Sequence, residues 1–215
     1  MLVSDLHPLN RIRIRFYKRQ LALLFFIAAC AMPAWAAEKE RAARKGEEGR
    51  RSVADASVLN EKGKSIRLSA LKKEGEILVL VFVASTCPVT HLYWDRIKGV
   101  WYNYRDRNVA MTLVGGNSDD SADKIRETLE ERDLELSLVW DEKHALARAL
   151  GVEFTPEVVV IGKNWEVLYR GRMDDSWRME GRARQRYLDA AVTAALLGQK
   201  TSNHVDDGFM GSRLR

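Results

Sequence analysis

The sequence has 215 residues, which is enough for one folded domain with a full hydrophobic core but too few for two domains of ordinary size. Its 35 Lys and Arg exceed its 30 Asp and Glu, but residues 1–36 hold five of the basic residues and one acidic residue, so the remainder has a net charge of only +1. Such a remainder lacks the clustered positive charge that attracts phosphate backbones, and the sequence has no zinc-finger or helix-turn-helix pattern. Nucleic acid is therefore not an expected partner.

The first 36 residues have the layout of a secretory signal peptide. Basic residues between positions 11 and 19 precede an apolar run from Leu21 to Met32, and Ala34-Trp35-Ala36 then resembles a cleavage site. The run is shorter than the roughly 20 residues that cross a bilayer, so export to the periplasm or another extracytoplasmic space is predicted in preference to a transmembrane helix. Ile27-Ala28-Ala29-Cys30 also resembles a bacterial lipobox, which leaves open a membrane-anchored lipoprotein acylated at Cys30.

Residues 37–52 are predicted to be a charged, solvated linker, and residues 53–197 the folded domain. Strands are expected where apolar residues run continuously or alternate with polar ones, at 65–68, 77–84, 108–115, 137–140, 157–161 and 165–170. Helices are expected from Pro88 to Tyr104, from the cap Ser121 to Arg132, from the cap Asp141 to Leu150 before Gly151, and over 187–196. Residues 198–215 are polar and weakly patterned, which predicts a flexible C-terminal tail.

The order of these elements predicts an α/β fold. A strand-helix-strand unit comes first, and a β-hairpin with a final helix follows it. This order is typical of a central mixed β-sheet with helices on its faces.

Cys87 is the candidate nucleophile. With Cys30 removed or acylated, it is the only thiol left in the domain, so no internal disulfide is possible. It stands between a buried strand and Pro88, a residue that fits the first turn of a helix. Unpaired N–H groups and the helix dipole stabilise a thiolate there, which predicts a lowered pKa. The alternative is a buried structural cysteine at the end of a core strand.

A buried strand, a Cys-Pro step that opens a long helix, and a later Gly-Val-x-x-Thr-Pro segment before a hairpin and a last helix resemble the thioredoxin-like redoxins of the AhpC/TSA and TlpA type. The resemblance covers residues 53–197. It implies that the peptide bond before Pro156 is cis and lies beside Cys87. It also implies that Thr155 pairs with a bound peptide or substrate.

Two departures from this family limit the chemistry. Thioredoxins have Cys-x-x-Cys, whereas the sequence Cys-Pro-Val-Thr puts the Thr90 hydroxyl where the resolving thiol would be. Peroxiredoxins have Pro-x-x-x-Thr-x-x-Cys, whereas Leu80 and Ala84 stand at those positions here. The resulting hypothesis is a one-cysteine thiol oxidoreductase without a cofactor. Cys87 attacks a disulfide or peroxide, Thr90 donates a hydrogen bond to its sulfur, and an external thiol or thiol-reducing protein regenerates it.

Other roles stay open at this point. His91 lies one helical turn after Cys87, at the position of a second cysteine in the thioredoxin-like Sco copper proteins, and sulfur with imidazole suits copper. A copper-binding module or metallochaperone using Cys87 and His91 is therefore an alternative, as is a non-catalytic module that holds a partner peptide beside Pro156. Within Gly171–Asp175, Arg172 is a candidate for binding an anionic substrate, and one of the two aspartates there could instead cap the final helix.

Overall fold

The computed structural model describes residues 34–178, 180–199 and 211–215. The chain divides into two compact units, residues 1–47 and 48–215. The predicted signal peptide lies, up to residue 33, outside the described residues. Among the helices of the described residues, none is both long enough and apolar enough to cross a membrane.

The charged segment 37–52 is helical and forms most of α2 (Ala34–Ala54). The sequence pattern predicted only a solvated linker here, because the segment has no apolar face. Alanine, glutamate, lysine and arginine nevertheless have high helix propensities, and Glu40 forms a 2.6 Å ion pair with Arg44 one turn later. Residues 38–45 are all exposed, as expected of a solvated segment.

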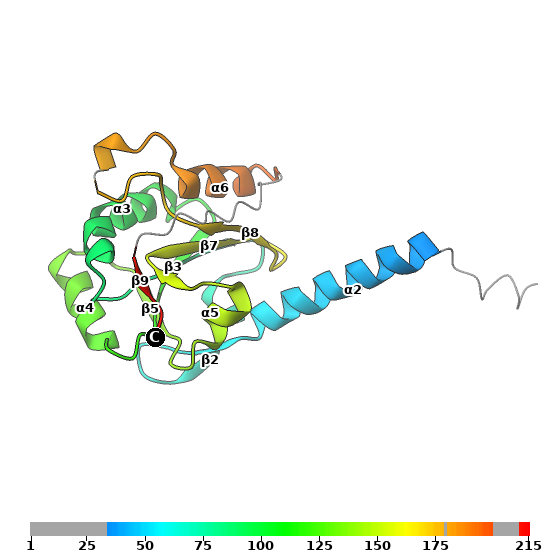
Figure 1. The fold of residues 1–215 in the computed structure, drawn as a ribbon, viewed down its shortest axis with the longest axis horizontal. Coiled ribbons are helices and arrows are strands. Elements are labelled where there is room, and N and C mark those ends of the chain that lie inside the picture. Colours follow the sequence, from blue (N-terminus) through cyan, green and yellow to red (C-terminus); the bar gives the residue numbers. More distant parts are fainter. Residues whose placement is uncertain (1–33, 179, 200–210) are drawn as a thin grey trace, which may run out of the picture. The chain divides into compact units, whose positions relative to one another are not determined.

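A mixed seven-stranded sheet forms the centre of the domain (Figure 1). In their order across the sheet, its strands are β2 (Ser65–Arg67), β1 (Ser57–Leu59), β5 (Ser137–Trp140), β4 (Val109–Gly115), β3 (Ile77–Phe82), β7 (Glu157–Ile161) and β8 (Val167–Gly171). β3 pairs in parallel with β4 and antiparallel with β7. All six side chains of β3 are buried, as its continuous apolar sequence predicted.

Helices cover both faces of the sheet. They are α3 (Pro88–Tyr104), α4 (Ala122–Glu131), α5 (Ala145–Leu150) and α6 (Tyr187–Leu196). The odd-numbered β3 residues from Ile77 to Val81 share one core with α3, α4 and α6, and the even-numbered residues from Leu78 to Phe82 share the other with α5. This division follows from the alternation of side chains along a strand, and it places α3 and α6 on the same side of the sheet (Figure 1).

Most of the predicted helix ends are confirmed. The Ser121 hydroxyl accepts a hydrogen bond from the backbone N–H three residues later at 3.4 Å, and Gly151 ends α5 with a φ of 72°. The N-cap of α5 is His144 rather than Asp141. The Asp141 carboxylate still accepts two N–H groups from the first turn of that helix, at 3.2 and 2.8 Å.

Several short elements were not predicted: β1 and the 3-10 turns η1 (Leu68–Leu71) and η2 (Glu180–Arg182). The hairpin of β7 and β8 is present as predicted, but β8 begins at Val167, because Trp165 has a φ of 66° and belongs to the turn. Segments of three or four residues are too short to show a clear hydrophobic period.

Residues 198–215 were predicted to be a flexible tail, and near the end of this segment the chain forms a short strand. β9 (Ser212–Arg213) pairs antiparallel with β6 (Phe154–Thr155), and residues 200–210 lie outside the described part of the chain. Backbone N–H and C=O groups can add a strand to a free edge without any apolar pattern in the added sequence. The sequence therefore carried no signal for this pairing.

Candidate active site around Cys87

The sheet brings two distant parts of the sequence together. Phe82, at the end of β3, pairs with Glu157, at the start of the antiparallel strand β7. The segments before α3 and before β7 therefore meet at one edge of the sheet, where Cys87 caps α3 and Thr155 precedes Pro156. The Thr155–Pro156 peptide bond is cis, as the resemblance implied.

Cys87 is the N-cap residue of α3, and Pro88 opens the first turn. The Cys87 thiol donates a hydrogen bond of 3.1 Å to the backbone carbonyl oxygen of Thr155, and the side chain has no exposed surface. The cysteine is thus both at a helix N-terminus and buried, so its position combines the two interpretations that the sequence allowed. The electrostatics of its surroundings decide between them.

Opposing effects act on the pKa of the Cys87 thiol. Burial is the largest and raises it, but hydrogen bonds from the side chains of Ser212 and Thr155, together with the backbone N–H and hydroxyl of Thr90, lower it. Together the hydrogen bonds outweigh burial, and the pKa falls from an ordinary value of 9.0 to about 7. An inert structural cysteine in apolar surroundings would have a raised pKa, so this site favours the thiolate.

Thr90 faces the sulfur from the first turn of α3. The residue is fully buried, and among the described residues its hydroxyl has no hydrogen-bond partner. A buried hydroxyl without a partner is costly, whereas a thiolate beside it is a good acceptor. The structure thus brings together three of the predicted site residues, Cys87, Thr90 and Thr155, whose roles stay predictions, and the Thr90 hydroxyl suits the ionised form of the cysteine.

Ser212 is the site residue that sequence reasoning missed. It comes from β9, where it lies opposite Thr155, and its side chain is the first of the groups that lower the pKa of the Cys87 thiol. No motif marks it, and it is 125 positions from Cys87 in the sequence. Only the pairing of β6 with β9 places its hydroxyl at the thiol.

The loop before Cys87 is held by Asp120. Its carboxylate accepts the Ser85 backbone N–H at 2.6 Å and also accepts the Ser85 hydroxyl. The His91 side chain is exposed and bonds through Nε2 to the Ser85 carbonyl oxygen at 2.7 Å. The His91 ring is therefore engaged with this loop, while the Cys87 thiol is engaged with Thr155.

Metal ligands do not gather at this site. Within the described part of the chain, no group of three or more His, Cys, Asp or Glu side chains is placed to hold a metal ion. Cys87 and His91 each have a hydrogen-bond partner of their own, at Thr155 and Ser85. The copper hypothesis thus gains no further ligand from the described residues.

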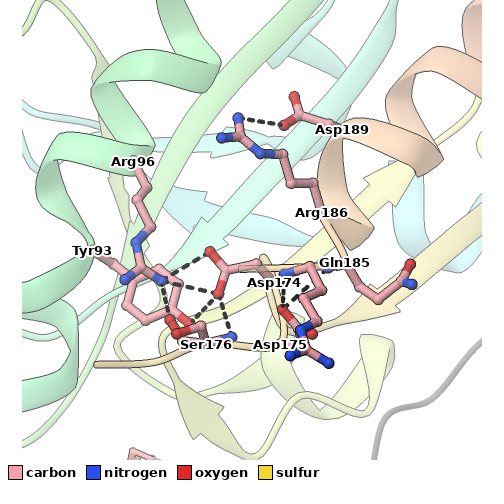
Figure 2. Close-up of polar contacts among 9 residues, drawn as sticks. Tyr93, Arg96, Asp174, Asp175, Ser176, Gln185, Arg186 and Asp189 are labelled. Carbon is pink, nitrogen blue, oxygen red and sulfur yellow. Dashed lines mark hydrogen bonds and ion pairs between the residues drawn. The ribbon is translucent and has the colours of Figure 1, made fainter. Parts of the chain in front are cut away.

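The segment that follows β8 packs against α3 through a buried ion pair (Figure 2). Asp174 accepts two hydrogen bonds from Arg96 Nη1, at 3.0 and 2.9 Å, and one from the Tyr93 hydroxyl at 3.1 Å. Asp175 accepts the backbone N–H groups of residues 184 and 185, at 2.9 and 3.1 Å, just before α6. Neither aspartate caps α6, whose N-cap residue Arg186 has no side-chain cap bond.

Arg172 lies on the side of the domain formed by α6. Its guanidinium carbon is 5.9 Å from the centre of the Tyr187 ring, at the start of that helix. This cation–π geometry connects β8 to α6. The role of Arg172 in binding a substrate remains a prediction.

Solved structures with the same fold include a hypothetical protein from Sinorhizobium meliloti, with 19% sequence identity and a TM-score of 0.66 over 75% of this chain and 91% of that one. They also include MTB DsbF, at 20% identity and a TM-score of 0.51 over 67% and 97% of the two chains. An uncharacterized thioredoxin-like protein from Porphyromonas gingivalis has 18% identity and a TM-score of 0.50 over 70% and 95%. These similarities confirm the predicted thioredoxin-like fold.

The sequence comparison gives the family. None of the curated proteins compared matches the sequence. The model of the AhpC/TSA family matches residues 50–170, which is more than half of the chain and includes Cys87, Thr90, Thr155 and Pro156. The chain therefore belongs to the AhpC/TSA family.

Proposed function

We propose that this protein is an exported thiol-dependent oxidoreductase in which Cys87 is the only redox-active group. The observation that carries the proposal is the set of hydroxyl and N–H donors around a thiol at a helix N-terminus. Ser212, Thr155 and Thr90 all stabilise the thiolate, and the pKa of Cys87 falls to about 7. A large fraction of the thiol is then ionised near neutral pH.

The reaction of a disulfide proceeds in two exchanges. The Cys87 thiolate attacks one sulfur of the substrate disulfide, forms a mixed disulfide with it and releases the other sulfur as a thiolate. An external thiolate then attacks the mixed disulfide, which frees Cys87 and leaves the external thiol joined to the substrate. A second external thiol completes the reduction, so the external thiols supply both electrons.

A peroxide would react at the same sulfur. Attack on the O–O bond leaves Cys87 as a sulfenic acid and releases an alcohol or water, and two external thiols then restore the thiol with loss of water. Leu80 and Ala84, at the positions that resemble those of the peroxidase motif, are fully buried and have no hydroxyl to bind a peroxide. This absence favours a disulfide as the substrate over a peroxide.

The proposed location is the periplasm or another extracytoplasmic space. The basic and apolar pattern of residues 1–36 supports export, with cleavage after Ala36 or acylation of Cys30 as the two routes. Intact mass measurement of the protein from an expressing bacterium distinguishes them, because cleavage leaves Ala37 as the first residue and acylation leaves a lipidated Cys30. Recovery of the uncleaved chain from the cytoplasm would contradict export.

The test of the chemistry uses the full chain with Cys30→Ala, so that Cys87 is its only thiol. Rates of alkylation by iodoacetamide across pH should give a pKa for Cys87 near 7, and glutathione disulfide should produce a mixed disulfide detectable by mass. Thr90→Val keeps the side-chain shape but removes a hydroxyl donor, so it should raise the pKa. Cys87→Ser confirms the site of modification. A thiol pKa of about 9 or above would refute the proposal.

A further inference from the structure

The last five residues of the sequence lie as an added strand beside Cys87. In β9, Ser212 is opposite Thr155 and Arg213 is opposite Phe154, with the chains antiparallel. Leu214 N–H donates to the Glu153 carbonyl oxygen at 2.9 Å, which extends the pairing by one residue. Figure 1 shows β9 in red.

A second anchor holds the end of this segment. Arg215 N–H donates to the Asn117 side-chain oxygen at 3.3 Å, and the Arg215 carbonyl oxygen accepts the Ser118 N–H at 2.9 Å. Residues 117 and 118 follow β4, so the segment bridges two loops at the same edge of the sheet. All of these bonds except the one to the Asn117 side chain use main-chain atoms of both partners, and main-chain atoms are common to any polypeptide.

Gly211 fits against Thr155 only because it has no side chain. A Cβ atom at this position would lie 1.9 Å from the Thr155 carbonyl oxygen and 2.9 Å from its carbon. This carbonyl oxygen is the same atom that accepts the Cys87 thiol. The strand is therefore in its closest contact with the domain directly at the reactive site.

Ser212 follows this glycine and pairs with Thr155, the residue whose carbonyl oxygen accepts the Cys87 thiol. Its side chain is the first of the groups that lower the pKa of that thiol. The Cys87 side chain, which also contacts Thr155, has no exposed surface. A sulfur atom that reacts with Cys87 therefore needs space beside Thr155, where Ser212 now lies. Serine and cysteine differ only in that one atom, but a hydroxyl cannot form a disulfide.

We propose that residues 211–215 occupy the edge of β6 where an extended segment of a partner protein binds, so that the partner must displace them before its disulfide reaches Cys87. This inference rests on the proposed function of Cys87. The structure also assigns the register of the partner: its attacked cysteine takes the place of Ser212, and a small residue precedes it at the place of Gly211. A partner segment of this kind would make the same main-chain bonds to Thr155 and Glu153.

The contacts between residues 211–215 and the rest of the domain are weak enough for a partner segment to replace them. Ser212 and Leu214 are only half-buried, and Gly211, Arg213 and Arg215 are exposed, so Leu214 is the one apolar side chain of the segment that packs against a core, at its margin. The ion pair between Arg213 and Glu153, at 3.4 Å, joins side chains that are more than half exposed. Displacing the strand would therefore remove the Leu214 contact at the margin of one core and leave the buried residues of both cores in place.

The test compares Gly211→Val with Gly181→Val in the full chain carrying Cys30→Ala. A side chain at position 211 collides with Thr155, whereas a Cβ at position 181 meets no atom within 4 Å, which makes it the matched control. Alkylation is measured at about pH 9.5, where the thiol is ionised in all variants, so that the rate reports access alone. Gly211→Val should be alkylated about tenfold faster or more, because the strand no longer has to dissociate before the reagent reaches the thiol. Gly181→Val should be alkylated at the rate of the chain that carries Cys30→Ala alone.

A second variant shows whether faster alkylation comes from loss of the strand or from misfolding of the domain. Leu214→Pro removes the N–H that bonds to Glu153 and changes no residue outside the segment. It should accelerate alkylation as Gly211→Val does, with an unfolding transition at an unchanged urea concentration for the domain. Equal rates in the original chain, Gly211→Val and Leu214→Pro would overturn the proposal.

The substrate arm uses the peptide Gly-Cys-Arg-Leu-Arg as its mixed disulfide with glutathione. Cys87 should displace glutathione and capture the peptide faster in Gly211→Val than in the original chain, and replacing the peptide glycine by leucine should slow capture. If alkylation accelerates but neither chain forms a mixed disulfide, the strand covers the thiol and the proposed function fails. If both chains capture the peptide at one rate, the proposed function survives and the cover is refuted.

Discussion

Asp174 supports the domain through the ion pair that it forms with Arg96 under the segment after β8 (Figure 2). The two side chains are only 7% and 5% exposed, and the Asp174 carboxylate also accepts the Tyr93 hydroxyl at 3.1 Å and the Ser176 N–H at 2.9 Å. Asp174→Ala removes all of these bonds together. It leaves the Arg96 guanidinium buried without its counter-ion.

The expected cost follows from that uncompensated charge. Removing one partner of a buried ion pair destabilises a protein by about 3–5 kcal/mol. Arg96 keeps its bond to the Ser176 carbonyl oxygen and its position 4.3 Å from the centre of the Tyr93 ring, so we expect the lower end, about 3 kcal/mol. With a urea slope of about 2 kcal/mol/M, the midpoint of unfolding should fall by about 1.5 M.

Asp95→Ala is the matched control. Asp95 also lies on α3 and also forms a 2.9 Å ion pair, with Arg132, but their side chains are 85% and 36% exposed. An exposed pair contributes about 0–1 kcal/mol, so the midpoint should move by less than about 0.5 M. Replacing both buried partners, with Arg96→Met and Asp174→Leu, should recover most of the loss because no buried charge remains. Equal shifts in Asp174→Ala and Asp95→Ala would refute the reasoning.

Three further predictions concern the active site and its supports. Folding lowers the pKa of Cys87 to about 7, so its thiolate stabilises the folded state fully above about pH 9. This contribution is lost as the pH falls through 7. In urea titrations, the free energy of unfolding of the original chain relative to Cys87→Ser should therefore increase between pH 7 and 9. Burial raises the pKa of Glu157, so the stability of the original chain relative to Glu157→Gln should fall as the pH rises above 4.5, in the same assay. In the chain with Cys30→Ala, Thr90→Cys places a second thiol in the first turn of α3, three residues after Cys87. Diamide oxidation should then yield an intramolecular disulfide, detected as the loss of two hydrogen atoms in the intact mass, and a variant that stays in the dithiol form would contradict the prediction.

The sequence was most informative where burial imposes a period. The strand Ile77–Phe82 was predicted because a strand covered on both faces must be apolar at every position, and the helix Pro88–Tyr104 because its apolar residues recur every three or four positions. The same elements fix Cys87 at the N-terminus of a helix. The reactive position in the fold was thus predictable from local pattern, and the resemblance to thioredoxin-like proteins added Thr155 and the cis bond before Pro156.

The contacts that the sequence did not reveal are those made by main-chain atoms or by single polar side chains far apart in the chain. The strand at Ser212 needs no pattern to add to the edge at Thr155, and its sequence resembles that of any polar tail. The ion pair between Arg96 and Asp174 was not predicted, and Asp174 was only one of two candidates for a cap of the final helix, because two charged residues 78 positions apart give no sign that they will be buried together. In both cases the fold, and not the local sequence, creates the partner.

The environment of Cys87 contains hydroxyl groups at the two places where sulfur would be needed for a self-contained cycle. Thr90 stands at the position of the second cysteine of a Cys-x-x-Cys motif, and Ser212 stands where we propose that the sulfur of a partner binds. A hydroxyl stabilises a thiolate by donating a hydrogen bond, but it cannot accept the bond from sulfur that a disulfide requires. Among the described residues, Cys87 therefore has no second thiol with which to form a disulfide. The proposed function accordingly takes its resolving sulfur from an external thiol.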